Sequence, residues 1–292
     1  MKKLSPKFFV IFKVAIWGTI AIFLTLVLVS FATEQSTRGR FGLKYIKDLF
    51  SRECEAEIVR KQEVPPDNAQ VIKIEWGYGD VSVSPTDGNN FVVVEKAAGK
   101  WQKSDLFEIT NANGTLSLKQ GGSGRNFVTF FNLRKRCLKR EISIPRSFKG
   151  KVYVKFSSGN FEIAGIEAES LELRMTSGVV KAEALKSGVL LIDMTSGILD
   201  MSGAFSEINA KCTSGIMKIQ ADEAPSKMIF DITSGTASIS IPENEGFTLS
   251  QSKTSGSLKC EFEVDEFGKY KNGSNQYAIK VTSGSAKLLR KK

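Results

Sequence analysis

Apolar residues alternate with polar ones on both sides of a Ser/Thr-Ser-Gly sequence that occurs seven times in the second half of the chain. The positions seven, five and three residues before the glycine are apolar in nearly every copy, as are those two and four residues after it. Because a period of two is that of a β-strand, each copy is predicted as a strand, a tight turn and a second strand. The copies lie at residues 157–159, 176–178, 195–197, 213–215, 233–235, 254–256 and 282–284.

The turn glycines are 19, 19, 18, 20, 21 and 28 residues apart. A repeat of roughly 20 residues is typical of stacked units rather than of an ordinary globular core. We therefore predict an all-β fold, a right-handed β-solenoid that resembles a parallel β-helix, with about nine rungs. Met175, Met194 and Cys212 hold equivalent places in successive copies and should lie one above another.

Outward positions carry alternating charges from copy to copy. One such column holds Arg174, Asp193, Lys211 and Asp231, and another holds Glu162, Lys181, Asp200 and Lys218. Opposite charges on neighbouring strands contribute roughly 0.2–1 kcal/mol per pair. A buried aliphatic side chain contributes about 1.5–3 kcal/mol. Charge should therefore help to set the register of the rungs, while the core decides stability.

Two inward positions are polar, and both belong to the sixth copy. They are Gln251 and Lys253. We expect either a frayed rung there or a lysine that lays its stem on the core and extends its amine into water.

The same alternation surrounds Gly79 and Gly114, which predicts two N-terminal rungs with longer excursions, one of them including a strand at 91–95. The folded domain should begin near Val71, after Pro65 and Pro66, and residues 71–292 should form one β-solenoid domain.

An apolar segment at residues 14–32 contains no charged residue and follows four lysines. Its 19 residues can span a bilayer core. We predict that residues 1–32 are a retained transmembrane anchor of a single-pass cell-membrane protein. The basic N-terminal tail favours an extracytoplasmic domain. Cleavage as a signal peptide after Ala32, which would yield a secreted protein, is the alternative.

Residues 33–70 form a polar, basic linker. Phe41, Tyr45 and Leu49 have helical spacing, which is typical either of a helix lying on anionic lipid or of a short capping or linker helix.

The net charge of +10 does not come from the repeats, because residues 151–292 hold 17 basic and 17 acidic side chains. Much of the excess lies in the insert at residues 121–140, which joins a Gly-rich stretch, an aromatic cluster and a basic run. Five side chains are candidates for binding an anionic polymer or lipid: Arg134, Lys135, Arg136, Lys139 and Arg140. The alternative is an exposed loop whose Phe127, Phe130 and Phe131 enter the core.

The composition excludes much of catalysis. The chain has no histidine, which removes histidine-dependent nucleophiles and the common zinc sites that use histidine. The acidic residues of the repeats share columns with cations, so they fit register pairing better than the paired acids of a glycosidase. We predict no catalytic, metal or cofactor residues, and keep a polysaccharide lyase or hydrolase as the least favoured alternative.

Smaller features have two interpretations each. The threonine column of the turns could contact sugars, or its hydroxyls could bond the local backbone. Cys212 and Cys260 are expected to be buried thiols, while Cys54 and Cys137 could form a disulfide outside the cytoplasm.

Several stretches together resemble a bacterial family of putative adhesins, a domain of unknown function that includes LiaG-like envelope proteins. They are GYGDVSV at 77–83, EISIPRSFKGKVYVKFSSGNFEI at 141–163, the repeated TSG and ISIPENEGF at 239–247. The resemblance implies a β-solenoid domain, often behind a membrane segment, and supplies no catalytic or ligand residues.

From these observations we expect a non-enzymatic, membrane-anchored cell-envelope protein whose solenoid is a surface for adhesion, scaffolding or stress sensing. Its partner would be an envelope polysaccharide, an anionic polymer or another protein, and no nucleic acid is expected. The alternative is a binding module that recognises an anionic polymer or lipid through residues 134–140.

Overall fold

The computed structural model describes residues 56–99, 101–121 and 137–291, which consist of strands, turns and one 3-10 helix. The elements in chain order are β1 (Glu57–Val64), β2 (Val71–Trp76), β3 (Asp80–Thr86), β4 (Phe91–Ala98), η1 (Lys103–Asp105), β5 (Phe107–Ala112), β6 (Thr115–Gln120), β7 (Cys137–Pro145), β8 (Lys151–Phe156), β9 (Asn160–Ala164), β10 (Glu167–Met175), β11 (Val179–Met194), β12 (Ile198–Cys212), β13 (Ile216–Ala221), β14 (Lys227–Ile232), β15 (Thr236–Ile241), β16 (Gly246–Lys253), β17 (Ser257–Cys260), β18 (Lys269–Lys271), β19 (Asn275–Val281) and β20 (Ser285–Arg290).

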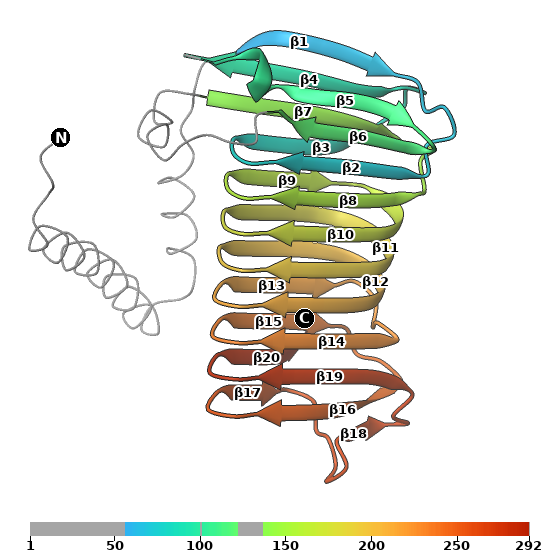
Figure 1. Ribbon diagram of the computed structural model, residues 1–292. Helices are drawn as coiled ribbons and strands as arrows, with labels where there is room; N and C mark the ends of the chain where they lie inside the picture. The colour runs from blue at the N-terminus through green and yellow to red at the C-terminus, as the bar shows by residue number, and fades with distance from the viewer. Residues whose placement is uncertain (1–55, 100, 122–136, 292) are drawn as a thin grey trace, which may run out of the picture. The chain divides into compact units, whose positions relative to one another are not determined.

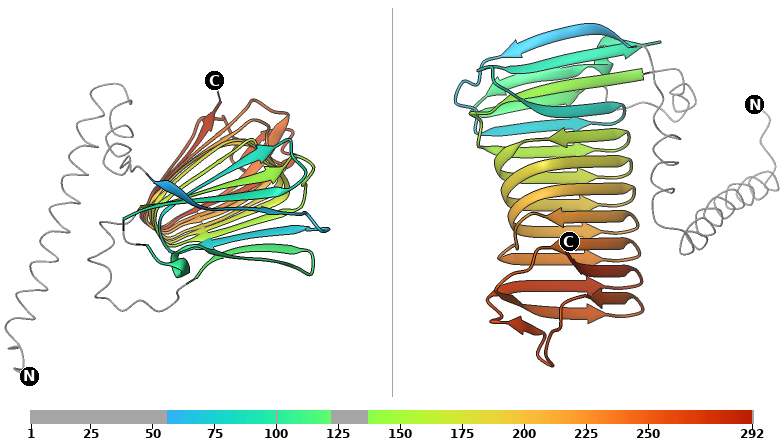
Figure 2. Two further views of the ribbon diagram at one scale, coloured as in Figure 1. Left: turned by 90° about the horizontal axis from the view of Figure 1, so that it is seen from above. Right: turned by 180° about the vertical axis from the view of Figure 1, so that it is seen from behind.

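Most of these strands wind into a solenoid with two opposite faces, seen from the front in Figure 1 and from above and behind in Figure 2. Each rung places one strand on the first face, passes through a turn and places the next strand on the second face. On both faces, neighbouring rungs pair in parallel. Counted over the described residues, nine rungs stack in this way, from β6/β7 at one end to β16/β17 at the other. The predicted β-solenoid is confirmed.

The core of the solenoid consists of columns of equivalent side chains. Met175 lies beside Met194, and Met194 lies beside Cys212, as the repeat predicted. Trp76 and Phe156 continue the same column, with stacked rings whose centroids are 4.6 Å apart. The inward positions of six copies are buried, and the exceptions all belong to the sixth copy.

The outward charges have the predicted register. Arg174 neighbours Asp193, and Asp193 neighbours Lys211. Not every neighbour in the register forms an ion pair. Arg174 pairs with Glu172 of its own strand at 2.6 Å, whereas Lys218 pairs with Asp200 of the neighbouring rung at 3.4 Å. Charge therefore supports the register without forming a continuous ladder of bonds.

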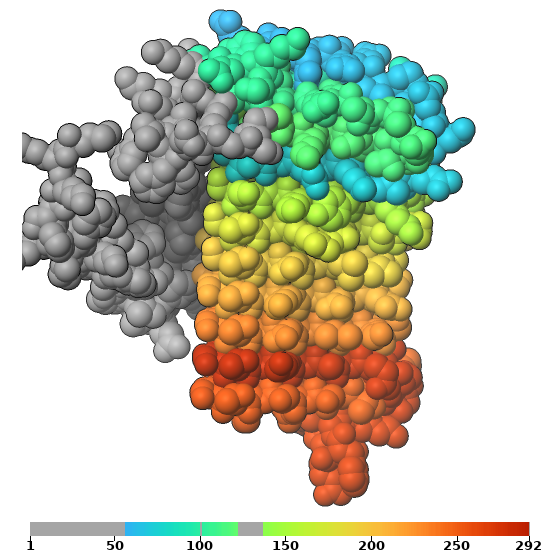
Figure 3. Space-filling view, in the orientation of Figure 1, coloured from blue at the N-terminus to red at the C-terminus, as the bar shows by residue number. Residues whose placement is uncertain are grey.

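The rungs do not stack in sequence order at the C-terminal end. The seventh copy, β19/β20, lies between the fifth, β14/β15, and the sixth, β16/β17. Figure 3 shows its dark red residues as a band between two lighter ones. The stacking of successive copies, predicted for Met175, Met194 and Cys212, therefore does not extend to the last three copies.

The position of the sixth copy explains its polar inward residues. Gln251 and Lys253 lie on the terminal rung, where no further rung covers them, and both are exposed. They are not part of a frayed interior rung. Polar groups at this end also disfavour the edge-to-edge association that an open sheet edge invites.

The N-terminal end differs from the prediction at Gly114. The rung around Gly79 is confirmed, because β2 pairs with β8 and β3 with β9. Gly114, in contrast, belongs to the tight turn of an antiparallel hairpin, β5–β6, where Asn113 and Gly114 both have positive φ. The rung at this end is β6/β7, and the insert stands where the other rungs have their turn.

The folded part begins earlier than Val71. Residues Glu57–Val64 form β1, which pairs antiparallel with β4, and β4 pairs antiparallel with β7. The linker predicted for 33–70 therefore does not extend to residue 70. The expected strand at 91–95 is present within β4.

Three of the predictions about local structure fall on residues outside the described ones. They are the anchor at 14–32 with its alternative cleavage after Ala32, the helical spacing of Phe41, Tyr45 and Leu49, and the three phenylalanines of the insert. Within the described ranges, no helix has the length and apolar character needed to cross a membrane.

Turn glycines allow the rungs to approach each other. A Cβ on Gly197 would lie 2.4 Å from the carbonyl oxygen of Gly178 and 2.8 Å from Met175 Cε, and the φ of Gly197 is +106°. We expect Gly197→Ala to lower the free energy of unfolding by about 1–3 kcal/mol, measured by denaturant titration. Gly88→Ala is the control, because its nearest neighbour would be Thr86 Oγ1 at 3.5 Å. Equal stability of both variants would contradict this account of the turn.

Candidate functional site

The insert joins the end of β6 to the start of β7, so its flanking residues fix where it leaves the solenoid. Arg134, Lys135 and Arg136 lie outside the described residues. Lys139 and Arg140 lie on β7, on opposite faces of the strand. Lys139 is half-buried and lies next to Asp80 of β3 and Lys96 of β4 in the sheet register.

Arg140 does not lie on the surface, and its prediction as an anion-binding residue is wrong. Its side chain is 1% exposed, because β7 turns Leu138, Arg140 and Ile142 toward the interior. A guanidinium in this position cannot reach an external polymer or lipid. The alternation of inward and outward positions along β7 indicates that Arg140 points inward, as Leu138 and Ile142 do. The surrounding basic residues made Arg140 resemble part of an exposed basic run.

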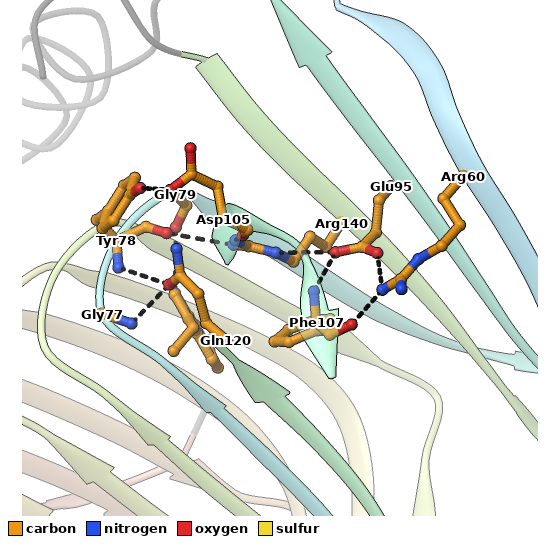
Figure 4. A network of polar contacts seen from close by, with 10 residues as sticks. Arg60, Gly77, Tyr78, Gly79, Glu95, Asp105, Phe107, Gln120 and Arg140 are labelled. Carbon is orange, nitrogen blue, oxygen red and sulfur yellow. Dashed lines mark hydrogen bonds and ion pairs between the residues drawn. The ribbon is translucent and has the colours of Figure 1, made fainter. Parts of the chain in front are cut away.

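A buried ion pair holds Arg140 in place (Figure 4). Its Nε lies 3.4 Å from Glu95 Oε1, and both side chains are 1% exposed. The other carboxylate oxygen of Glu95 contacts the guanidinium of Arg60, and Phe107 N donates a hydrogen bond of 2.8 Å to Glu95 Oε1. The guanidinium of Arg140 also stacks over the Phe107 ring, 4.7 Å from its centroid. One carboxylate on β4 thus connects arginines from β1 and β7.

Two backbone carbonyls accept hydrogen bonds from Arg140. Nη2 donates to Asp105 O at 2.6 Å and Nη1 donates to Tyr78 O at 3.2 Å. The buried Asp105 carboxylate accepts from Tyr78 OH at 2.6 Å and from Gln102 N at 2.8 Å. We call Arg60, Glu95, Asp105 and Arg140 the buried ionic cluster.

Gln120 closes the same region at the end of β6. Its Oε1 accepts from Gly77 N at 2.9 Å and from Tyr78 N at 3.4 Å. The turn between β2 and β3 is therefore held by the residue from which the insert departs.

The electrostatics of the buried ionic cluster favour a structural role. The cluster contains two arginines and two carboxylates, so the formal charges balance. Burial lowers the pKa of Arg140, and the negative charge of Glu95 opposes that effect. Because the Glu95 oxygens already face two arginines and a backbone N–H, the group is suited to holding elements together rather than to transferring protons.

Sequence reasoning missed Glu95, Asp105 and Arg60 as partners of Arg140. They are 45, 35 and 80 residues away from it in the chain. The antiparallel pairing of β1, β4 and β7 brings Arg60 and Glu95 to Arg140, and η1 places Asp105 beside it.

The turn hydroxyls act between rungs rather than within one turn. Ser177 Oγ donates to Ser157 O and Ser196 Oγ donates to Thr176 O, each at 3.1 Å. These serines of the Thr-Ser-Gly turns thus contribute to stacking, and the prediction for the neighbouring threonine column stays a prediction.

The remaining features carry little chemistry. A hollow of about 200 Å³ at the opposite edge is lined by Pro85, Ile144, Phe148 and Ile166, with Arg146 and Lys149 at its rim. Both cations are already paired, with Asp87 and Glu167 respectively. Across the described ranges, no group of three or more acidic or cysteine side chains is placed to hold a metal ion.

The described cysteines differ in state. Cys212 is a buried free thiol and Cys260 a half-buried one, and burial raises the pKa of both. Cys137 takes part in a disulfide. Cys54, its predicted partner, lies outside the described residues.

Stacked parallel rungs with a continuous apolar core define this protein as a β-solenoid repeat protein. The model of the Toastrack family, DUF4097, matches the sequence at residues 69–204 and 161–289, which together extend over most of the chain. The chain belongs to this family.

Several solved structures are similar to this chain at low sequence identity. A protein described as a putative cell adhesion protein from Clostridium sporogenes is 14% identical, with a TM-score of 0.39, covering 81% of this chain and 100% of that one. A putative adhesin from Bacteroides fragilis is 12% identical, with a TM-score of 0.42, covering 81% and 98%. One from Parabacteroides distasonis is 12% identical, with a TM-score of 0.39, covering 80% and 98%. No curated protein matches the sequence.

The buried ionic cluster can be tested by removing its central carboxylate. We expect Glu95→Ala to lower the free energy of unfolding by about 3–5 kcal/mol, because Arg140 would keep a buried charge without its partner. The matched control is Glu141→Ala, which removes the exposed partner of Lys96 and should cost about 0–1 kcal/mol. Denaturant titration of both variants measures the difference. Similar losses would show that the cluster does not hold this end of the solenoid.

Proposed function

We propose that this protein is a non-enzymatic component of the cell envelope, anchored by residues 14–32, whose solenoid is a surface for adhesion, scaffolding or stress sensing. The observation that carries the proposal is the stack itself. Its nine rungs, counted over the described residues, form a long stack (Figure 1). Outward side chains recur at equivalent positions on both of its faces.

The outward side chains support a binding surface better than a reaction centre. Asp200 lies between Lys181 and Lys218, and Asp193 lies between Arg174 and Lys211. Each carboxylate therefore has cations as its lateral neighbours on both adjacent rungs, so pairing between rungs accounts for its position. A glycosidase instead needs two carboxyl groups that flank one glycosidic bond.

Capture of envelope partners tests this function. Full-length protein should retain an envelope polymer or protein from intact cells, and it should show no saccharide cleavage. The control is the Gly197→Ala variant, measured at a temperature at which this variant is unfolded and the unchanged protein is folded. Capture by the variant should be abolished, because it depends on the folded stack. Saccharide cleavage that is lost in Asp200→Asn but kept in Glu141→Gln would overturn the proposal.

A second candidate function is recognition of an anionic polymer or lipid through the insert. The specific observation that favours it is the position of Lys139, half-exposed on β7 next to Lys96, where the insert rejoins the solenoid. Arg140 is excluded from this surface, so the candidate residues are Arg134, Lys135, Arg136 and Lys139.

Vesicles test the second candidate. Binding to vesicles containing phosphatidylglycerol should weaken as salt is added and should fall strongly when the four residues become Gln. The matched control replaces four basic residues of the solenoid face with Gln: Lys151, Lys155, Lys211 and Lys227. Equal binding by both variants would discard this function.

A further inference from the structure

The last two rungs of the solenoid form a unit of their own. β16 pairs in parallel with β19, β17 pairs in parallel with β20, and β18 pairs antiparallel with β16. An aromatic cluster fixes this arrangement: Phe247 stacks on Tyr277 at 4.5 Å, and Phe262 meets Tyr270 edge-on at 5.1 Å. We call residues 246–290 the C-terminal unit.

A single seam joins the C-terminal unit to the rest of the solenoid. It consists of β14 against β19 and β15 against β20. At the turn, Thr282 N donates to Ile232 O at 2.8 Å and Ser285 N donates to Gly235 O at 2.9 Å. Buried side chains of β14 lie directly beside those of β19, such as Phe230 beside Ile279. The edge of β14 and β15 is therefore specific in both hydrogen bonds and shape.

The chain crosses this seam in an unusual way. In the regular rungs, the strand after a turn leads directly into the next rung, as β11 and β12 do. Here residues 242–245 connect β15 to β16, which is the second rung away, and they pass the place that β19/β20 occupies. Such a short connection with a proline at its start is a suitable hinge for exchange between copies.

The seam also joins residues that are far apart in sequence. Gly235 and Gly284 occupy neighbouring turns although they are 49 residues apart, whereas Gly178 and Gly197 are 19 apart. The edge of β14/β15 therefore pairs with residues from the end of the chain and not with the strands that follow it directly in sequence. The same edge fits the β19/β20 pair of any copy.

We propose that the C-terminal unit exchanges between two copies of this chain, so that β19/β20 of one molecule pairs with β14/β15 of another. The partner that this surface fits is a second copy, because the seam contains the register, the inward side chains and the turn contacts of this sequence. The result is a dimer in which each solenoid is completed by the C-terminal unit of the other copy.

Ion pairs bind the hinge to the C-terminal unit, because Glu243 pairs with Arg290 at 2.7 Å and with Lys271 at 2.6 Å. Lys291 pairs with Asp222 at 2.5 Å, a contact that an exchanged dimer would form between the two copies. Exposed pairs of this kind stabilise little and are screened by salt, so they delay the exchange without preventing it.

Disulfide trapping tests the exchange in full-length protein. Thr236 and Ser285 face each other across the seam, with outward side chains. One chain receives Thr236→Cys and a second, with a different affinity tag, receives Ser285→Cys. Both also contain Cys260→Ser, and the two chains are expressed together. Exchange predicts a covalent dimer of the two chains, captured through either tag.

Two controls define the result. The mixture of Ile216→Cys with Thr236→Cys probes the seam between β13 and β15, which lies inside the regular stack. The covalent dimer should be several times more abundant for the Thr236/Ser285 mixture. A single chain with both Thr236→Cys and Ser285→Cys shows that the geometry allows the bond. No dimer, or equal dimer in both mixtures, would overturn the proposal.

A hinge variant gives an independent measurement. Inserting four Gly/Ser residues after Asn244 lets each chain reach its own seam more easily. The amount of the second chain that is captured without any disulfide should then fall several-fold. Unchanged capture would place the contact elsewhere in the chain and overturn the proposal.

Discussion

The close approach of successive turns is the interaction on which the structure depends. Val179 N donates to Gly159 O at 3.1 Å and Ile198 N donates to Gly178 O at 2.9 Å, and the same contact recurs along the edge of the stack. A Cβ at Gly178 would lie 2.3 Å from the carbonyl oxygen of Gly159. Only glycine therefore permits the rungs to approach closely enough to pair along both faces. Once they do, the inward side chains of the interior rungs pack against their equivalents in the next rung, and the core becomes continuous.

A stack of this kind has an open sheet edge at each end, where another molecule could pair. The two ends differ in how this edge is protected. At the N-terminal end, antiparallel strands cover the last rung, and the buried ionic cluster ties them to it through Arg140 and Glu95. Charges are costly to bury, so such a cluster serves specificity of assembly as much as stability. At the C-terminal end, no further rung of the described residues packs on β16/β17. Two inward positions of that rung are therefore exposed, and they hold Gln251 and Lys253 instead of apolar residues. Both devices limit the stacking of one solenoid on another.

The two ends differ from the regular middle in the features that they add to the repeat. The middle rungs supply length, rigidity and repeated surface chemistry, which suit a scaffold. The insert leaves the solenoid at the N-terminal rung, and the out-of-order rung lies at the other end. Features particular to this chain are thus concentrated where the repeat is interrupted, as expected when the repeat itself provides only support.

The sequence alone determined the repeat, the strand alternation and the columns of the core, because each depends on spacing within about 20 residues. Met175, Met194 and Cys212 could be placed together from their spacing to the turn glycine. Only the tertiary structure decided the burial of Arg140, the hairpin at Gly114 and the position of β19/β20 between earlier rungs. Those features depend on pairings between residues far apart in the chain, such as Arg140 with Glu95 and Gly235 with Gly284, which local periodicity does not encode.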